Sequence, residues 1–222
     1  MVAQILHDGV LPAITGLLPS DDTHQDLPPF VNDLLSLLNL ILPQTDIDRQ
    51  HQQKMMVFGP RQAYAPSEDP NSPYQLLKAA TAQLEAQKQE LCSGLEASFY
   101  EFLASSLLPK LFFLYRVNVG QNFRERCISI IDKVLAALPD TIATEKIDPV
   151  SLAQLVNQIL ATGTGEQVLR VLYITSRALQ SNPVKFVIPF QREGACQVIV
   201  DLAAGTPQSL AKYDVEQEQP QA

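Results

Sequence analysis

Three short apolar stretches decide the fold of this chain: LPKLFFLY at 108–115, LAQLVNQI at 152–159 and CQVIVDL at 196–202. They begin at residues 108, 152 and 196 and are therefore spaced 44 residues apart. A fourth copy, LPAITGLL at 11–18, lies two such periods upstream with nine residues to spare. A period of this size is typical of stacked helical units, because one unit buries its apolar face only against its neighbours.

The rest of the chain also favours helix. Leu and Ala dominate, and no apolar alternation typical of a strand persists; the best candidate, FVI at 186–188, stops at Pro189. A helix after Gly120 and a helix after Gly165 repeat the spacing, 45 residues apart. Helical spacing of apolar residues predicts an all-α chain with helices at 13–18, 30–42, 74–115, 123–138, 149–160, 166–180 and 194–203.

This pattern divides the chain into four parts. Helices of the repeating type are expected in 1–43 and 74–204. Residues 44–73 contain no Leu and four prolines, which predicts a mobile insertion or linker, and the Gln- and Glu-rich residues 205–222 predict a disordered tail. At the N-terminal end Ile5, Leu11 and Ile14 predict an uncovered apolar face, so we expect an array that is incomplete at its ends.

Charge and cysteine content exclude several classes. The chain carries 16 basic and 24 acidic residues, for a net charge of −8, which argues against binding nucleic acid through its phosphates. No apolar run is long enough to cross a membrane. Three widely spaced cysteines form no disulfide framework and fit a reducing compartment, so we expect a protein of the nucleus or cytoplasm.

An all-helical period in this range is typical of armadillo and HEAT arrays. The stretches HDGVLPAI at 7–14 and REGACQVI at 192–199 resemble the opening of the third armadillo helix. More narrowly, the blocks 107–111 with 123–127, 169–179 and 190–194 resemble the armadillo segment of one class of HECT ubiquitin ligases, the ubiquitin-fusion-degradation class, which includes the thyroid-receptor-interacting ligase. The resemblance covers about 107–203 best, and before Pro73 it rests mainly on 9–18.

This resemblance implies a non-catalytic armadillo platform of a longer ligase chain, which binds protein substrate or ubiquitin. The catalytic cysteine of a HECT ligase lies in a separate domain and follows a Thr. Here Cys92, Cys127 and Cys196 follow Leu, Arg and Ala, so none inherits that role. No catalytic, cofactor-binding or metal-ligating residue is therefore predicted.

Four other signals each have a simpler reading. Asp21, Asp22 and Asp26 resemble the magnesium motif of prenyl-transferring enzymes, but no second acidic motif follows, which favours a solvated loop. The GTG sequence at 163–165 follows a helix, which favours a helix–helix loop over a dinucleotide turn. Cys127 has basic neighbours but sits at a core position, which favours a buried apolar role. The three histidines are scattered away from any ligand spacing.

Surface residues remain as candidates for function. The resemblance implies that third helices line a concave groove, and it assigns that position to the 108, 152 and 196 stretches. Asn157 resembles the groove asparagine whose amide pairs with an extended peptide backbone, although a plain surface asparagine is an equal alternative. The predicted partner-binding residues are Lys110, Arg116, Asn118, Gln154, Asn157, Gln158, Arg192 and Gln197.

Three classes of function stay open at this point. The first is the substrate-binding part of a HECT-type ligase. The second is a stand-alone armadillo adaptor or scaffold, against which the absence of Trp counts where nuclear transport is concerned. The third is an all-α enzyme, which the missing second acidic motif disfavours.

Overall fold

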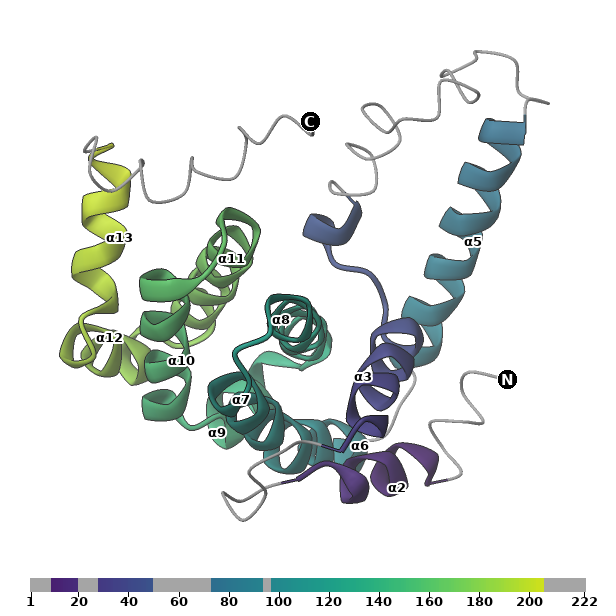
Figure 1. Cartoon of the computed structure of the whole chain (residues 1–222), viewed down its shortest axis with the longest axis horizontal. Coiled ribbons are helices and arrows are strands. Elements are labelled where there is room, and N and C mark those ends of the chain that lie inside the picture. Colours follow the sequence, from purple (N-terminus) through teal and green to yellow (C-terminus); the bar gives the residue numbers. More distant parts are fainter. Residues whose placement is uncertain (1–8, 20–27, 50–72, 94–96, 206–222) are drawn as a thin grey trace.

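The computed structural model describes residues 9–19, 28–49, 73–93 and 97–205, and every regular element in these ranges is a helix (Figure 1). The prediction of an all-α chain is therefore confirmed. The elements are α2 (Val10–Leu17), α3 (Phe30–Ile41), α5 (Pro73–Ser93), α6 (Ala97–Phe102), the π-helix η2 (Leu103–Leu107), α7 (Leu108–Val117), α8 (Gln121–Ala137), α9 (Asp140–Lys146), α10 (Pro149–Thr162), α11 (Gly165–Ser181), α12 (Pro183–Arg192) and α13 (Ala195–Ala203). One further helical turn spans 46–49.

The helices pack in two rows. In one row α3 packs against α8, and α8 against α11; in the other, α7 packs against α10, and α10 against α13. The rows are joined where α7 packs on α8 and α10 on α11, while the short helices α9 and α12 fill in beside them. Figure 1 shows α8 and α11 in the middle of the molecule, between α13 on one side and α5 on the other.

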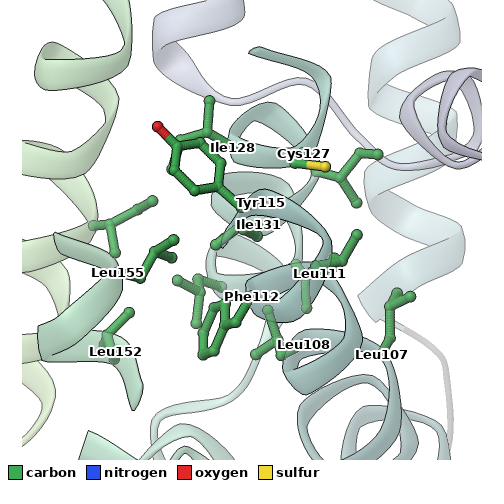
Figure 2. Close-up of a cluster of buried hydrophobic side chains, with 14 of the residues drawn as sticks. Leu107, Leu108, Leu111, Phe112, Tyr115, Cys127, Ile128, Ile131, Leu152 and Leu155 are labelled. Carbon is green, nitrogen blue, oxygen red and sulfur yellow. The ribbon is translucent and has the colours of Figure 1, made fainter. Parts of the chain in front are cut away.

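The repeated apolar stretches supply the core where the rows meet. Figure 2 shows side chains of α7, α8 and α10 gathered in one cluster. Leu111 of the first stretch is fully buried and Leu155 of the second is 1% exposed. The Tyr115 hydroxyl donates a hydrogen bond to Gln167 Oε1 at 3.1 Å, which satisfies this buried polar group and ties α7 to α11.

Side-chain caps explain where three helices begin. Asp148 accepts from the Ser151 backbone N–H before α10, Thr164 accepts from Gln167 N–H before α11, and Asn182 accepts from Lys185 N–H before α12. Proline stands in the first turn of α10 and of α12, where a backbone N–H would have no acceptor within the helix, so the missing N–H of proline costs no hydrogen bond. Gly163 and Thr164 form the loop between α10 and α11, and Gly165 is the first residue of α11, so the predicted helix–helix connection is confirmed.

Sequence analysis missed α9 and α12. Both are short, and α12 contains the FVI run that most resembled a strand. Phe186 and Phe190 lie one helical turn apart and are fully buried, so the apolar residues of this segment follow a helical period rather than alternation.

The predicted helical stretch 74–115 is divided. Helix α5 ends at Ser93, and a continuous helical path from Ala97 to Val117 then passes through η2. The wide turn in η2 precedes Pro109, which lacks an N–H and whose ring crowds the preceding turn of a regular helix. On α5 the predicted apolar positions Leu76 and Leu84 are exposed, because few residues of α5 contact the body.

Two predictions about organisation are wrong. Residues 44–49 are part of the folded body rather than of a mobile insertion, with Thr45 and Ile47 buried; residues 50–72 lie outside the described ranges. Leu11 and Ile14, expected to be uncovered, are 0% and 6% exposed because they belong to the common core. Ile5 and the predicted tail beyond Gly205 also lie outside the described residues.

Candidate partner-binding groove

A polar seam runs along the contact between α3 and α8. Asn32 and Ser36 lie one turn apart on α3, so both face the same side of the helix. Arg126 of α8 reaches across to them: its Nη1 donates to Asn32 Oδ1 at 2.6 Å and to Ser36 Oγ at 3.0 Å. The guanidinium therefore sits at the solvent-facing edge of the seam with its donors oriented.

The seam continues around Asn39 on the next turn of α3. Ser129 Oγ donates to Asn39 Oδ1 at 3.2 Å, and Lys133 Nζ donates to the backbone carbonyl of Asn39 at 2.7 Å. Beneath these polar groups the two helices meet through fully buried apolar side chains: Val31, Leu35 and Leu38 of α3 and Cys127, Ile130, Ile131 and Val134 of α8. The α3–α8 contact therefore combines buried apolar side chains with a row of polar hydrogen bonds.

Residues 44–49 place an acidic side chain over α8 and α11. Asp48 Oδ1 lies 2.8 Å from Arg170 Nη1, and Asp48 Oδ2 lies 3.6 Å from Lys133 Nζ. The turn is set locally, because Thr45 N–H donates to Asp48 Oδ2 at 3.1 Å and Asp48 N–H donates back to Thr45 Oγ1 at 3.4 Å. A single carboxylate thus bridges two cations that come from different helices.

Burial and ion pairing act in opposite directions on the pKa values of these three groups. Burial alone would raise the pKa of the Asp48 carboxyl, but Lys133, Arg170 and the Thr45 N–H outweigh burial and hold that pKa below its ordinary value of 3.8. Burial lowers the pKa of Lys133, and Asp48 opposes this shift. For Arg170 burial is likewise opposed by Asp48 and Glu166, and its pKa is raised. The partners therefore outweigh burial for Asp48 and Arg170, whereas burial prevails for Lys133.

A second carboxylate lies deeper in the same network. The Asp132 side chain is 2% exposed, and its oxygens lie 3.8 Å from Arg170 Nη1 and 3.7 Å from Arg177 Nη1. Burial raises the pKa of Asp132, and this effect outweighs a hydrogen bond from Thr45 and the charges of Arg177 and Arg170, which lower that pKa. Glu166 completes the set by accepting from Arg170 Nη2 at 3.0 Å.

Helix α5 touches the groove through polar groups. Glu85 Oε2 accepts from the Gln44 backbone N–H at 2.7 Å, and Glu85 Oε1 accepts from Lys88 Nζ at 2.7 Å. The Lys88 side chain is only 8% exposed, although it lies on an otherwise exposed helix. These contacts join α5 to the segment that carries Asp48.

Two adjoining hollows open along the α3–α8 contact. One, of about 430 Å³, is lined by Asn39, Gln44, Asp48, Asn122, Glu125, Arg126, Ser129, Lys133 and Arg170. The other, of about 630 Å³, is lined by Pro28, Pro29, Asn32, Asn118, Gly120, Gln121, Asn122 and Phe123. Asn122 lines both, so we treat them as one groove, the α3–α8–α11 groove. Its amides, hydroxyls and cations can pair with the backbone and side chains of an extended segment.

Lys110 and Asn118, two of the predicted partner-binding residues, have structural hydrogen bonds. Lys110 Nζ donates to the carbonyls of Thr15 at 2.7 Å and Leu18 at 3.0 Å, and so satisfies the end of α2. Asn118 Oδ1 accepts from the Gly120 N–H at 2.7 Å in the turn before α8. Of the predicted residues, only Asn118 also lines the α3–α8–α11 groove.

The other predicted residues lie along the second row of helices or next to it. Gln154, Asn157 and Gln158 share α10, and Gln197 lies on the neighbouring α13. Arg116 and Arg192 are exposed near the ends of α7 and α12. Arg116 lines a separate hollow of about 270 Å³ beside α9 and α10. The structure therefore spreads these residues over a second surface, which stays a prediction.

Sequence analysis missed the central groove residues Asp48, Lys133 and Arg170. Asp48 lies in a segment with no apolar period, which predicted an insertion. Lys133 and Arg170 are flanked by apolar residues in their helices, and a charged residue at a buried helical position is the signal that could have revealed them.

Nothing in the described part of the chain adds reactive chemistry to the groove. Cys127 is fully buried in α8, as the apolar reading predicted, and burial raises the pKa of its thiol, so the reactive thiolate is disfavoured. Within the described ranges no three His, Cys, Asp or Glu side chains are grouped to hold a metal ion. Asp21, Asp22, Asp26 and the three histidines lie outside these ranges. Among the helices described, none is both long and apolar enough to span a membrane.

Comparisons of the chain with protein-family models, with curated proteins and with solved structures found no match.

Proposed function

We propose that this chain is an armadillo-like scaffold that binds an extended segment of a partner protein in the α3–α8–α11 groove. The helix spacing supports a repeating array: α8 and α11 begin 44 residues apart, and α9 and α12 begin 43 apart. Equivalent helices also contact one another, as α8 does α11 and α10 does α13. Neighbour-to-neighbour contact is what stacking of repeated units requires.

The lengths of the helices assign them to positions within a unit. The seven-residue α9 precedes α10 and the 17-residue α11, which is the order short, medium, long. In this order α10 is the second helix of a unit and α11 is the third. Because α3 and α8 belong to the same row as α11, they take the third position as well. Sequence analysis had assigned the third position to the row of α10. The armadillo resemblance, applied with the observed helices, therefore favours the α3–α8–α11 groove.

The observation that carries the proposal is that a short segment of the chain itself packs against α8 and α11 at the edge of this groove. Residues 44–49 contact it through the Asp48 carboxylate and bury Thr45 and Ile47 beside it. A short segment whose side-chain carboxylate is bound by two cations is an arrangement that a protein ligand can reproduce. The surface is therefore chemically suited to hold such a segment.

The ubiquitin-ligase setting rests on the sequence resemblance alone. In that setting the groove holds a protein substrate or ubiquitin for a HECT-type catalytic domain elsewhere in a longer chain. The alternative is a stand-alone armadillo adaptor that has no part in ubiquitin transfer. Titration of the labelled chain with ubiquitin, followed by NMR, separates ubiquitin binding from binding of other proteins.

A matched pair of blocking substitutions tests the groove. Peptides selected on the wild-type chain by display should lose at least tenfold in affinity when Asn122→Trp fills the point where the two hollows join. Gln154→Trp places the same bulk on exposed α10 in the other row and should leave affinity unchanged. Loss of affinity on Gln154→Trp but not on Asn122→Trp would show that the peptide binds to the α7–α10–α13 row and would contradict the proposal.

A further inference from the structure

We infer that the α3–α8–α11 groove recognises a carboxylate side chain of its partner at the place where Asp48 now lies, so that residues 44–49 act as a resident competitor for an acidic protein segment. This inference rests on the proposed function of the groove and names the chemistry of its ligand.

Two cations form ion pairs with one carboxylate. Lys133 and Arg170 project from α8 and α11, and their side chains are 6% and 7% exposed. The two oxygens of Asp48 are divided between them, with Oδ1 on Arg170 and Oδ2 on Lys133. Buried cations favour a carboxylate over a neutral group, because removing the anion leaves charge without compensation in a poorly solvated place. The chemistry of the site thus selects an acidic side chain.

Exchange of one carboxylate for another is feasible because both cations keep other contacts. Arg170 retains Glu166 at 3.0 Å and Asp132 at 3.8 Å, and Lys133 retains the Asn39 carbonyl at 2.7 Å. These groups belong to the helices, so they stay in place when residues 44–49 leave. The cations are then positioned and partly neutralised, but they lack the group that bridges them.

Residues 44–49 are tethered next to the two cations and can therefore compete with a partner for them. They follow α3 directly and are held by the Asp48 ion pairs, by Ile47, and by the bond from Gln44 N–H to Glu85 of α5. A tethered segment acts at a high effective concentration, on the order of millimolar for a short linker. A partner must therefore outcompete it, and weakening the tethered carboxylate should raise the affinity for an acidic ligand.

The sequence of the chain supplies both the probe peptide and the control variant. The probe is a fluorescent peptide with the sequence LPQTDIDR of residues 42–49, and its counterpart LPQTDINR replaces the Asp48 carboxylate by an amide. Asp48→Lys should repel the tethered segment from Lys133 and Arg170. Asp46→Lys makes the same charge change two residues away, at a side chain that is 74% exposed and pairs only with Arg49 in the described residues. Circular dichroism and thermal unfolding check that both variants are folded.

Fluorescence anisotropy should show that the Asp48→Lys chain binds LPQTDIDR at least tenfold more tightly than the wild-type and Asp46→Lys chains do. Binding of LPQTDINR should be at least tenfold weaker, and adding Arg170→Gln should abolish the gain. If Asp48→Lys unfolds the chain, the milder Asp48→Asn takes its place with the same expectations.

Equal binding of LPQTDIDR and LPQTDINR would overturn the carboxylate inference and leave the groove as a protein-binding surface. Equal competition by a short single-stranded oligonucleotide would overturn it in favour of a general anion site. Absence of binding by either peptide to any variant would overturn it as well, and the display-selected peptides then decide separately whether the proposed function survives.

Discussion

The Asp48 carboxylate lies 2.8 Å from the Arg170 guanidinium, which joins the segment after α3 to the N-terminal half of α11. The other oxygen of Asp48 faces Lys133 of α8, so the same carboxylate also contacts the helix between α3 and α11. All three helices of one row are therefore linked by a single carboxylate on the face where the groove opens. Its loss should affect both the stability of the row and the chemistry of the groove.

Asp48→Asn should lower the free energy of unfolding by about 1–3 kcal/mol at neutral pH, because a carboxylate paired with buried cations becomes a neutral amide. The folded-state pKa of Asp48 lies below 3.8, so its contribution is fully present above that pH and is lost as the pH falls through the lower folded value. Urea denaturation from pH 7 down to pH 3 should show the difference between the two chains shrinking only at the acid end. Both chains contain Asp132, whose pKa is raised by burial, so the comparison between them isolates the contribution of Asp48. A difference that does not change with acidification would contradict this assignment.

Lys110→Met should destabilise the chain by about 1–2 kcal/mol, because the amine no longer satisfies the carbonyls of Thr15 and Leu18 at the end of α2. Arg116→Met lies on the same helix but is exposed, and should change stability by less than about 0.5 kcal/mol. Thermal unfolding of the two variants makes the comparison. Equal stability of the two would indicate that Lys110 has no capping role and is free to contact a partner, as the sequence predicted.

Gly163→Ala should destabilise the α10–α11 turn by about 1–3 kcal/mol, since the added Cβ would stand 2.6 Å from the Ile159 carbonyl oxygen. Gly165 is two residues away and has nothing within 4 Å of such a Cβ, so Gly165→Ala should be neutral. Chemical denaturation of both variants provides the measurement. Tolerance of Ala at 163 would show that the turn is wider than described.

Leu155→Ala should cost about 2–5 kcal/mol of stability, because this side chain is 1% exposed where α7, α8 and α10 meet (Figure 2). Asn157→Ala on the same helix removes a half-buried amide and should leave the chain folded. Melting curves should separate the two variants by several degrees. Similar melting temperatures would mean that the repeated stretch does not form the core.

The sequence was most informative where apolar period and core coincide. The stretches at 108 and 152 predicted α7, α10 and their buried leucines, because a helix buries residues at its own period. It was least informative for residues 44–49, which pack through one ion-paired carboxylate and one turn instead of an apolar stripe. Helix α9 was missed because seven residues are too few to show a period.

The groove could not be derived from the sequence for a related reason. Arg126, Ser129 and Lys133 share one face of α8, but only the packing of α3 shows that this face meets Asn32, Ser36 and Asn39. The partners are some 90 residues apart in the chain, and no local pattern links them. The order short, medium, long that we use to propose a position for α10 likewise depends on α9, which the sequence did not reveal.

Paramagnetic relaxation with a nitroxide-labelled, display-selected peptide bound to the ¹⁵N-labelled chain shows which row of helices the partner contacts. The account predicts that amide signals of Asn122, Arg126 and Ser129 on α8 broaden on binding, while those of Gln154 and Asn157 on α10 and Gln197 on α13 keep their intensity. Broadening confined to the α10 and α13 residues would contradict the account and place the partner on the other row of helices.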